Sequence, residues 1–124
     1  MRGTETILLV DDEPGILAVS KVILESLGYS VYEAQNGGEA IRIYQEKKDM
    51  IDLVVLDMIM PGLSGSEVFD HIRELNPSVK VILSSGYSLN DQAQQIMSKG
   101  CQGFIQKPFD LTGISRKIRE VLEK

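Results

Sequence analysis

Near its middle the chain reads Leu53-Val54-Val55-Leu56-Asp57-Met58-Ile59-Met60-Pro61-Gly62-Leu63-Ser64-Gly65. An apolar run that is too short for a helix and is followed by a Pro-Gly turn predicts a strand buried on both faces. Asp57 stands at the end of that strand. A carboxylate there is costly unless something binds it, because an isolated charge taken out of water is strongly penalised. Alone, Asp57 could equally well begin a turn, so its role depends on what else reaches the same edge of the sheet.

Length and composition describe one globular domain. The chain has 124 residues, of which 43% are hydrophobic and 25% charged, and this size suits a single core. Its 18 acidic and 13 basic residues give a net charge of −5. We therefore expect no direct nucleic-acid binding and no membrane insertion, and favour a protein partner or a cation. A single cysteine, Cys101, and the lack of a signal peptide favour the cytoplasm and an unpaired, structural thiol.

Strand and helix patterns alternate after a short leader at residues 1–5, and the predicted fold is therefore α/β. Because every crossover carries a helix, the sheet should be parallel and covered on both faces, a doubly wound (βα)5 fold in one domain over residues 6–124. The predicted strands are residues 6–10, 31–34, 53–56, 79–83 and 104–105. The predicted helices run from Pro14 to Gly28, from the Asn36 cap, from the Ser64–Glu67 capping box to Asn76, over 90–98, and over 111–122.

The ends of four predicted strands carry side chains that suit chemistry. They are Asp11 and Asp12, Asp57, Ser85, and Lys107. In open parallel sheets ligands bind beyond the carboxyl ends of the strands, where the strand order reverses. With strand order 2-1-3-4-5, the three carboxylates should meet in one crevice. Like charges that close need a cation, and ligands that are all oxygen, with no nearby His or Cys, favour Mg²⁺.

Such a site with a lysine opposite suggests phosphoryl transfer. A carboxylate can attack phosphorus to give an aspartyl phosphate, and cations and donors then balance the charge on the transferred group. Each residue alone has an ordinary alternative: the acidic pair can start a helix, Lys107 can be a solvated loop lysine, and Ser85 can belong to a turn. Their coincidence at successive strand ends favours the functional interpretation.

The chain resembles the receiver domains of bacterial response regulators and hybrid sensor histidine kinases, from Ile7 to Leu122. The resemblance rests on Leu9-Val10-Asp11-Asp12-Glu13, on Leu56 to Gly65, on Ser84-Ser85-Gly86-Tyr87 and on Lys107-Pro108-Phe109. It implies the flavodoxin-like strand order and a phosphoryl group transferred to Asp57 from a histidine kinase or a histidine phosphotransfer protein. It also implies Mg²⁺ held by Asp12, Asp57 and the Ile59 backbone carbonyl, with help from Asp11, and a cis Lys107-Pro108 bond.

The resemblance further implies a switch. Ser85 would move toward the phosphoryl group, Lys107 would sense it, and Phe104 would turn into the vacated space. The face formed by the fourth helix, fifth strand and fifth helix would then bind a downstream protein target. Such a domain is a signalling switch and not an enzyme, beyond its own phosphorylation and dephosphorylation. Ile59 offers neither carboxylate nor amide to position a water, so we expect slow dephosphorylation.

Three other functions compete with this one. A Mg²⁺-dependent phosphatase with an Asp nucleophile needs a second Asp where this chain has Ile59, and it needs a cap domain. A flavodoxin-like electron carrier would have to place the flavin phosphate against Asp11 and Asp12, which would repel it. A pseudo-receiver that only docks would have no reason to keep the full set of site residues. The lone His71 lies within a predicted helix, which favours a surface histidine over a phosphodonor.

Overall fold

The computed structural model describes residues 3–58, 60, 62–86, 91–107 and 110–123. Its strands form one parallel sheet in the order β2-β1-β3-β4-β5, which confirms the predicted fold class and strand order. The strands are β1 (Thr6–Val10), β2 (Ser30–Ala34), β3 (Leu53–Asp57), β4 (Val81–Ser85) and β5 (Gly103–Gln106). The helices are α1 (Pro14–Ser26), α2 (Gly37–Lys47), α3 (Gly65–Leu75), α4 (Asp91–Ser98) and α5 (Leu111–Leu122).

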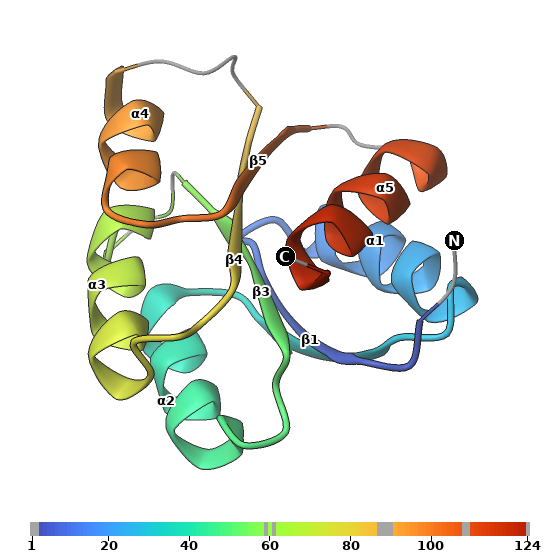
Figure 1. Cartoon of the computed structure of the whole chain (residues 1–124), viewed down its shortest axis with the longest axis horizontal. Coiled ribbons are helices and arrows are strands. Elements are labelled where there is room, and N and C mark those ends of the chain that lie inside the picture. The colour runs from blue at the N-terminus through green and yellow to red at the C-terminus, as the bar shows by residue number, and fades with distance from the viewer. Residues whose placement is uncertain (1–2, 59, 61, 87–90, 108–109, 124) are drawn as a thin grey trace.

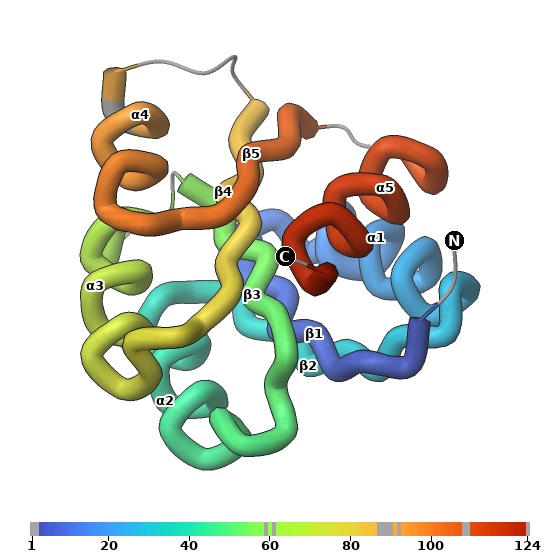
Figure 2. Tube along the Cα trace, in the orientation of Figure 1, coloured from blue at the N-terminus to red at the C-terminus, as the bar shows by residue number. Residues whose placement is uncertain are grey.

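The helices divide between the two faces of the sheet (Figure 1). Helices α1 and α5 lie on one side, and α2, α3 and α4 lie on the other. Alternate residues of each central strand point to opposite layers: Leu8 and Val54 pack with α2, α3 and α4, whereas Ile7 and Leu53 pack with α1 and α5. This arrangement explains why β1, β3 and β4 are mainly apolar, because both of their faces are buried. The tube in Figure 2 shows the strands passing between the two layers.

The fourth strand is shifted relative to its prediction. The sequence pattern predicts residues 79–83, whereas the strand covers Val81–Ser85. The Val79 N–H closes a turn onto the Asn76 carbonyl, and the Val79 carbonyl accepts from the Gln102 side-chain amide. The backbone of Val79 is therefore occupied by local contacts before the strand begins. The shift matters for the site, because it makes Ser84 and Ser85 the last residues of a buried strand.

Local sequence explains the helix starts. The Asn36 side chain accepts from the Glu39 N–H, and Ser64 and Glu67 form the predicted capping box at the start of α3. Pro14 occupies the first turn of α1, where a missing N–H costs nothing. Helices α1 and α2 begin four and three residues after the ends of β1 and β2, and α3 begins eight residues after the end of β3, so their first turns border the loops at the carboxyl edge of the sheet.

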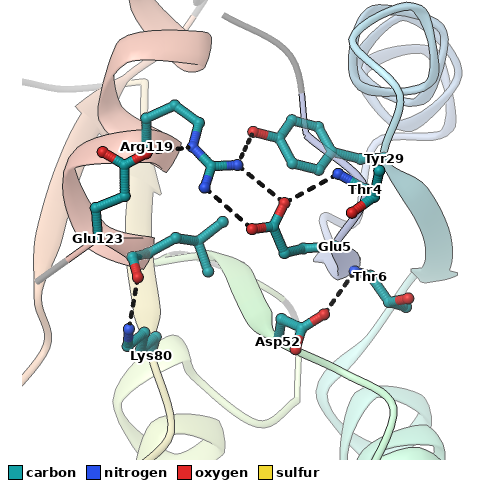
Figure 3. Close-up of polar contacts among 9 residues, drawn as sticks. Thr4, Glu5, Thr6, Tyr29, Asp52, Lys80, Arg119 and Glu123 are labelled. Carbon is teal, nitrogen blue, oxygen red and sulfur yellow. Dashed lines mark hydrogen bonds and ion pairs between the residues drawn. The ribbon is translucent and has the colours of Figure 1, made fainter.

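Residues 3–5, expected as a leader, contact Leu27, Tyr29 and α5, and Figure 3 shows the contacts that Glu5 makes. The Gly3 N–H donates to the Leu27 carbonyl at 3.0 Å. Two guanidinium nitrogens of Arg119, on α5, donate to the two carboxylate oxygens of Glu5 at 2.9 and 3.0 Å. The same guanidinium donates to the hydroxyl of Tyr29 at 3.3 Å. The segment thus joins the end of α1 to the last turns of α5.

Two minor expectations concern Cys101 and His71. Cys101 is buried with its thiol 3.2 Å from the Val81 carbonyl oxygen, and burial raises the pKa of that thiol. This favours a structural role for the thiol. His71 is exposed on α3.

Within the described residues, no helix has both the length and the apolar character needed to cross a bilayer.

Candidate functional site

The predicted site residues meet at the carboxyl ends of the strands. Asp11 follows β1, Asp57 ends β3, Ser85 ends β4, and Lys107 follows β5. Asp57 lies opposite Ser84 in the register of β3 with β4, and the Lys107 N–H donates to the Ser85 carbonyl at 2.6 Å. The parallel register alone therefore brings residues from four distant parts of the sequence to one edge.

Asp11 is buried, with 2% of its surface exposed, and each of its carboxylate oxygens accepts a hydrogen bond. One of its carboxylate oxygens accepts from the Glu13 N–H at 3.0 Å, and the other accepts from the Lys107 ammonium at 2.9 Å. The backbone turn that leads into α1 thus fixes the orientation of this carboxylate. Asp11 can in turn fix the position of Lys107.

Lys107 reaches both buried carboxylates. Its ammonium lies 2.9 Å from Asp11 Oδ2 and 3.4 Å from Asp57 Oδ1, and its side chain is only 9% exposed. Burial by itself would lower the pKa of Lys107, but the hydrogen bond to Asp11 and the charges of Asp57 and Asp11 raise it above its ordinary value. The lysine is therefore held in its charged form beside Asp57.

The three carboxylates form an acidic cluster that suits a cation. Asp11, Asp12 and Asp57 each offer one oxygen, and these oxygens lie within 4.8 Å of one another. Asp11 and Asp57 are buried, whereas Asp12 is partly exposed. A set of carboxylate oxygens, with no imidazole or thiolate among the cluster, fits a hard ion such as Mg²⁺ or Ca²⁺. The donor set thus agrees with the kind of ion that was expected.

The remaining predicted residues fall into two groups. Ser85 is buried at 2% exposure, and Phe104 is partly buried on β5 and packs against the α2, α3 and α4 layer. Ser85 thus lies on β4, the neighbour of the strand that carries Asp57, and Phe104 lies on β5, the strand that leads to Lys107. Ile59, whose carbonyl was expected to bind the ion, and Pro108, whose peptide bond was expected to be cis, lie outside the described residues.

Two features of the site could not be found from local sequence. The Asp11–Lys107 contact joins residues 96 positions apart. Neither the residues around Asp11 nor those around Lys107 have a pattern that indicates this pairing. Gly65, at the start of α3, packs directly against the backbone of Asp57 and Met58. Its presence in the Leu63-Ser64-Gly65 turn suggested a helix start, but not a contact with the strand end.

Known proteins resemble this chain in sequence. The response regulator receiver domain family matches residues 7–119. The sensor kinase CckA of Brucella abortus is 36% identical over 124 residues, which are 100% of this chain and 13% of that protein. The chain thus spans a small part of this relative's length.

Solved structures agree closely with the fold. A response regulator receiver domain protein from Clostridium thermocellum has a TM-score of 0.91 at 34% identity, covering 96% of this chain and 94% of that one. The response regulator TrrA of Thermotoga maritima, solved in complex with Mg²⁺ and BeF, has a TM-score of 0.84 at 34% identity, covering 94% and 98%. The chain belongs to the response regulator receiver domain family and is a phosphoacceptor module of two-component signalling.

Proposed function

We propose that Asp57 is the phosphoacceptor and that the domain switches a protein-binding face when it is phosphorylated. The observation that carries the proposal is the Lys107 ammonium, which lies 3.4 Å from Asp57 in a cluster of three carboxylates, two of them buried. A cation held beside the acceptor can neutralise charge on an incoming phosphoryl group. The proposed donor is a phosphohistidine on a histidine kinase or on a histidine phosphotransfer protein, in the cytoplasm.

The transfer step follows from the groups present. A carboxylate oxygen of Asp57 attacks phosphorus as the bond between phosphorus and the donor imidazole nitrogen breaks. The electron pair of that bond stays on the imidazole nitrogen, which takes up a proton from solvent water. Lys107 contacts one oxygen of the transferred group, and the Ser85 hydroxyl contacts another. Asp11 keeps Lys107 in place during this step, because it already accepts a hydrogen bond from the ammonium.

Mg²⁺ is the proposed ion at the acidic cluster. Asp12 and Asp57, with the Ile59 carbonyl, would hold it, and Asp11 would help from the side of Lys107. When bound, Mg²⁺ supplies positive charge that offsets the charge of the phosphoryl oxygens. TrrA, which has the same fold, was solved in complex with Mg²⁺ and BeF, and this supports the choice of Mg²⁺ over Ca²⁺.

The proposed output is a change in the face formed by α4, β5 and α5. Ser85 ends β4, and Phe104 lies on the neighbouring β5, opposite Leu83 in the register. A shift of Ser85 toward the phosphoryl group would open space into which the Phe104 side chain can turn. The surface formed by α4, β5 and α5 would then change shape. This face is proposed to bind the downstream protein target.

The test is intact-mass measurement after incubation with acetyl phosphate and Mg²⁺. We expect the wild type to gain one phosphoryl group, Asp57→Ala to gain none, and Asp49→Ala, which changes an exposed carboxylate outside the cluster, to behave as the wild type. A label that persists in Asp57→Ala would refute the assignment of the acceptor. No label in the wild type would favour a pseudo-receiver, and release of inorganic phosphate from a phosphoester would favour a phosphatase.

A further inference from the structure

Gly65 lies against the backbone at the carboxyl end of β3. A Cβ atom built on it would lie 2.7 Å from the Asp57 carbonyl oxygen and 2.8 Å from both the Cα and the carbonyl oxygen of Met58. Real Cβ contacts are essentially never this short, and all three neighbours are backbone atoms, which cannot rotate away as a side chain can. Only glycine fits here without moving the strand end.

Hydrogen bonds hold this close approach from both sides. The Gly65 N–H donates to the Met58 carbonyl at 3.1 Å, and the Met58 N–H donates to the Ser84 carbonyl at 2.9 Å. Both backbone polar groups of Met58 are therefore used, one by β4 and one by α3. The peptide that follows Asp57 is clamped between the neighbouring strand and the first residue of the helix.

The capping box completes the clamp. The Ser64 side chain accepts from the Glu67 N–H, and the Glu67 side chain accepts from the Ser64 N–H. These two bonds fix the first turn of α3, and with it the position of Gly65. The capped first turn of α3 thus packs against the peptide that joins Asp57 to Met58.

We propose that Gly65 is a positioning residue for Asp57. This inference rests on the proposed role of Asp57 as phosphoacceptor. A methyl group at Gly65 would push the end of β3 away from α3 and displace the Asp57 carboxylate relative to Asp11, Asp12 and Lys107. Misplacing a reacting group by about 1 Å can slow a reaction by roughly a hundredfold.

The test compares Gly65→Ala with two other Gly→Ala variants. Gly103→Ala is the crowded control, because its Cβ would lie 3.1 Å from Val121 Cγ2 and 3.2 Å from Lys117 Cδ, which are side-chain atoms of α5 outside the carboxylate cluster and away from α3. Gly15→Ala is the open control, because nothing lies within 4 Å of its Cβ. Each protein is checked by thermal unfolding, titrated with Mg²⁺ by calorimetry without any phosphodonor, and phosphorylated with acetyl phosphate at saturating Mg²⁺.

For Gly65→Ala we expect weaker Mg²⁺ binding and a maximal phosphorylation rate lowered about tenfold to a hundredfold, with an unchanged acetyl phosphate concentration at half-maximal rate. Both controls should keep the wild-type values. Mg²⁺ affinity and maximal rate equal to those of Gly103→Ala would overturn the proposal. Should the wild type take no label, or Asp57→Ala take one, the proposed function fails, and the Mg²⁺ titration still decides whether Gly65 positions the carboxylate.

A second variant weakens the clamp without adding an atom. Ser64→Ala takes away the cap that holds Gly65 against Met58, and we expect the same direction of change, weaker Mg²⁺ binding and a lower maximal rate, with a smaller size. If Gly65→Ala does not fold, Ser64→Ala decides alone: wild-type Mg²⁺ affinity and maximal rate in that variant would overturn the proposal.

Discussion

The Lys107 ammonium lies 2.9 Å from a carboxylate oxygen of Asp11, although 96 positions of sequence separate the two residues. The side chains are 9% and 3% exposed. Water therefore screens this pair little, and each charge depends on the other for compensation. The same ammonium lies 3.4 Å from Asp57 Oδ1, so the charge of Lys107 acts on the carboxylates that follow β1 and end β3.

Replacing Lys107 by Met should destabilise the protein and make its stability depend on Mg²⁺. Two buried carboxylates lose their cation, and removing one partner of a buried pair costs about 3 kcal/mol or more. Mg²⁺ should restore part of the loss, because an ion that binds only the native state stabilises it. Urea unfolding with and without Mg²⁺ measures both effects.

The matched control is Lys21→Met, which breaks a surface pair with Glu33 whose side chains are 38% and 35% exposed. It should cost less than about 1 kcal/mol and show no rescue by Mg²⁺ beyond that of the wild type. Equal losses in the two variants would contradict a special role for the buried pair.

Alkaline pH should remove the contribution of Lys107. Its pKa is raised in the folded protein, since the hydrogen bond to Asp11 and the neighbouring carboxylates outweigh the effect of burial. The stabilisation is thus fully present below the unfolded pKa of about 10.4 and is lost as the pH rises through the folded pKa. We expect the difference in unfolding free energy between wild type and Lys107→Met to shrink over that range. A difference that stays constant would be inconsistent with the pairing.

The fold and the members of the site could be predicted because the relevant signals are local. Apolar runs mark the strands, caps mark the helices, and Asp57 and Ser85 come one and two residues after the predicted ends of β3 and β4. The partner of Lys107 could not be predicted, because a parallel register determines which strand ends are neighbours but not which oxygen a flexible lysine reaches. The close approach at Gly65 could not be predicted for a related reason, since a glycine at a helix start has several possible causes. The predicted start of β4 is wrong because a side chain of another segment, Gln102, occupies the backbone there.

The Glu5–Arg119 pair should stabilise the domain at neutral pH, and this stabilisation should be lost at acidic pH. The hydrogen bond from Arg119 lowers the pKa of Glu5. The stabilisation is therefore present above the unfolded pKa of about 4.3 and lost as the pH falls through the lower, folded value. A double-mutant cycle with Glu5→Gln and Arg119→Gln should give a coupling of about 1 kcal/mol at neutral pH.

A second cycle provides the comparison for this pair. Arg42 and Glu46, with side chains 60% and 56% exposed, should couple by about 0.3–0.5 kcal/mol. A Glu5–Arg119 coupling no larger than this, or one that persists in acid, would show that residues 3–5 do not secure α5.

Replacing Ile59 by Asn should shorten the life of the phosphorylated state. The prediction comes from sequence alone, because Ile59 lies outside the described residues. An aliphatic side chain two positions after Asp57 cannot orient a water toward phosphorus, whereas an amide can. Decay of the phosphorylated mass after removal of acetyl phosphate gives the rate for wild type, Ile59→Asn and, as a control for shape, Ile59→Leu. The same decay rate in all three would remove the explanation.

Asp11 and Asp12, although adjacent, should respond differently to loss of charge. Asp11 is buried and holds both Lys107 and the Glu13 N–H, so Asp11→Asn should destabilise the protein by about 2 to 3 kcal/mol even without Mg²⁺. Asp12 is partly exposed, and its carboxylate belongs to the acidic cluster. Asp12→Asn should therefore weaken Mg²⁺ binding in calorimetry while leaving the urea midpoint in Mg²⁺-free buffer unchanged or slightly higher, because it removes a like charge. Equal destabilisation in the two variants would mean that Asp12, too, supports the fold, and that the division between a lysine-holding and an ion-holding carboxylate is wrong.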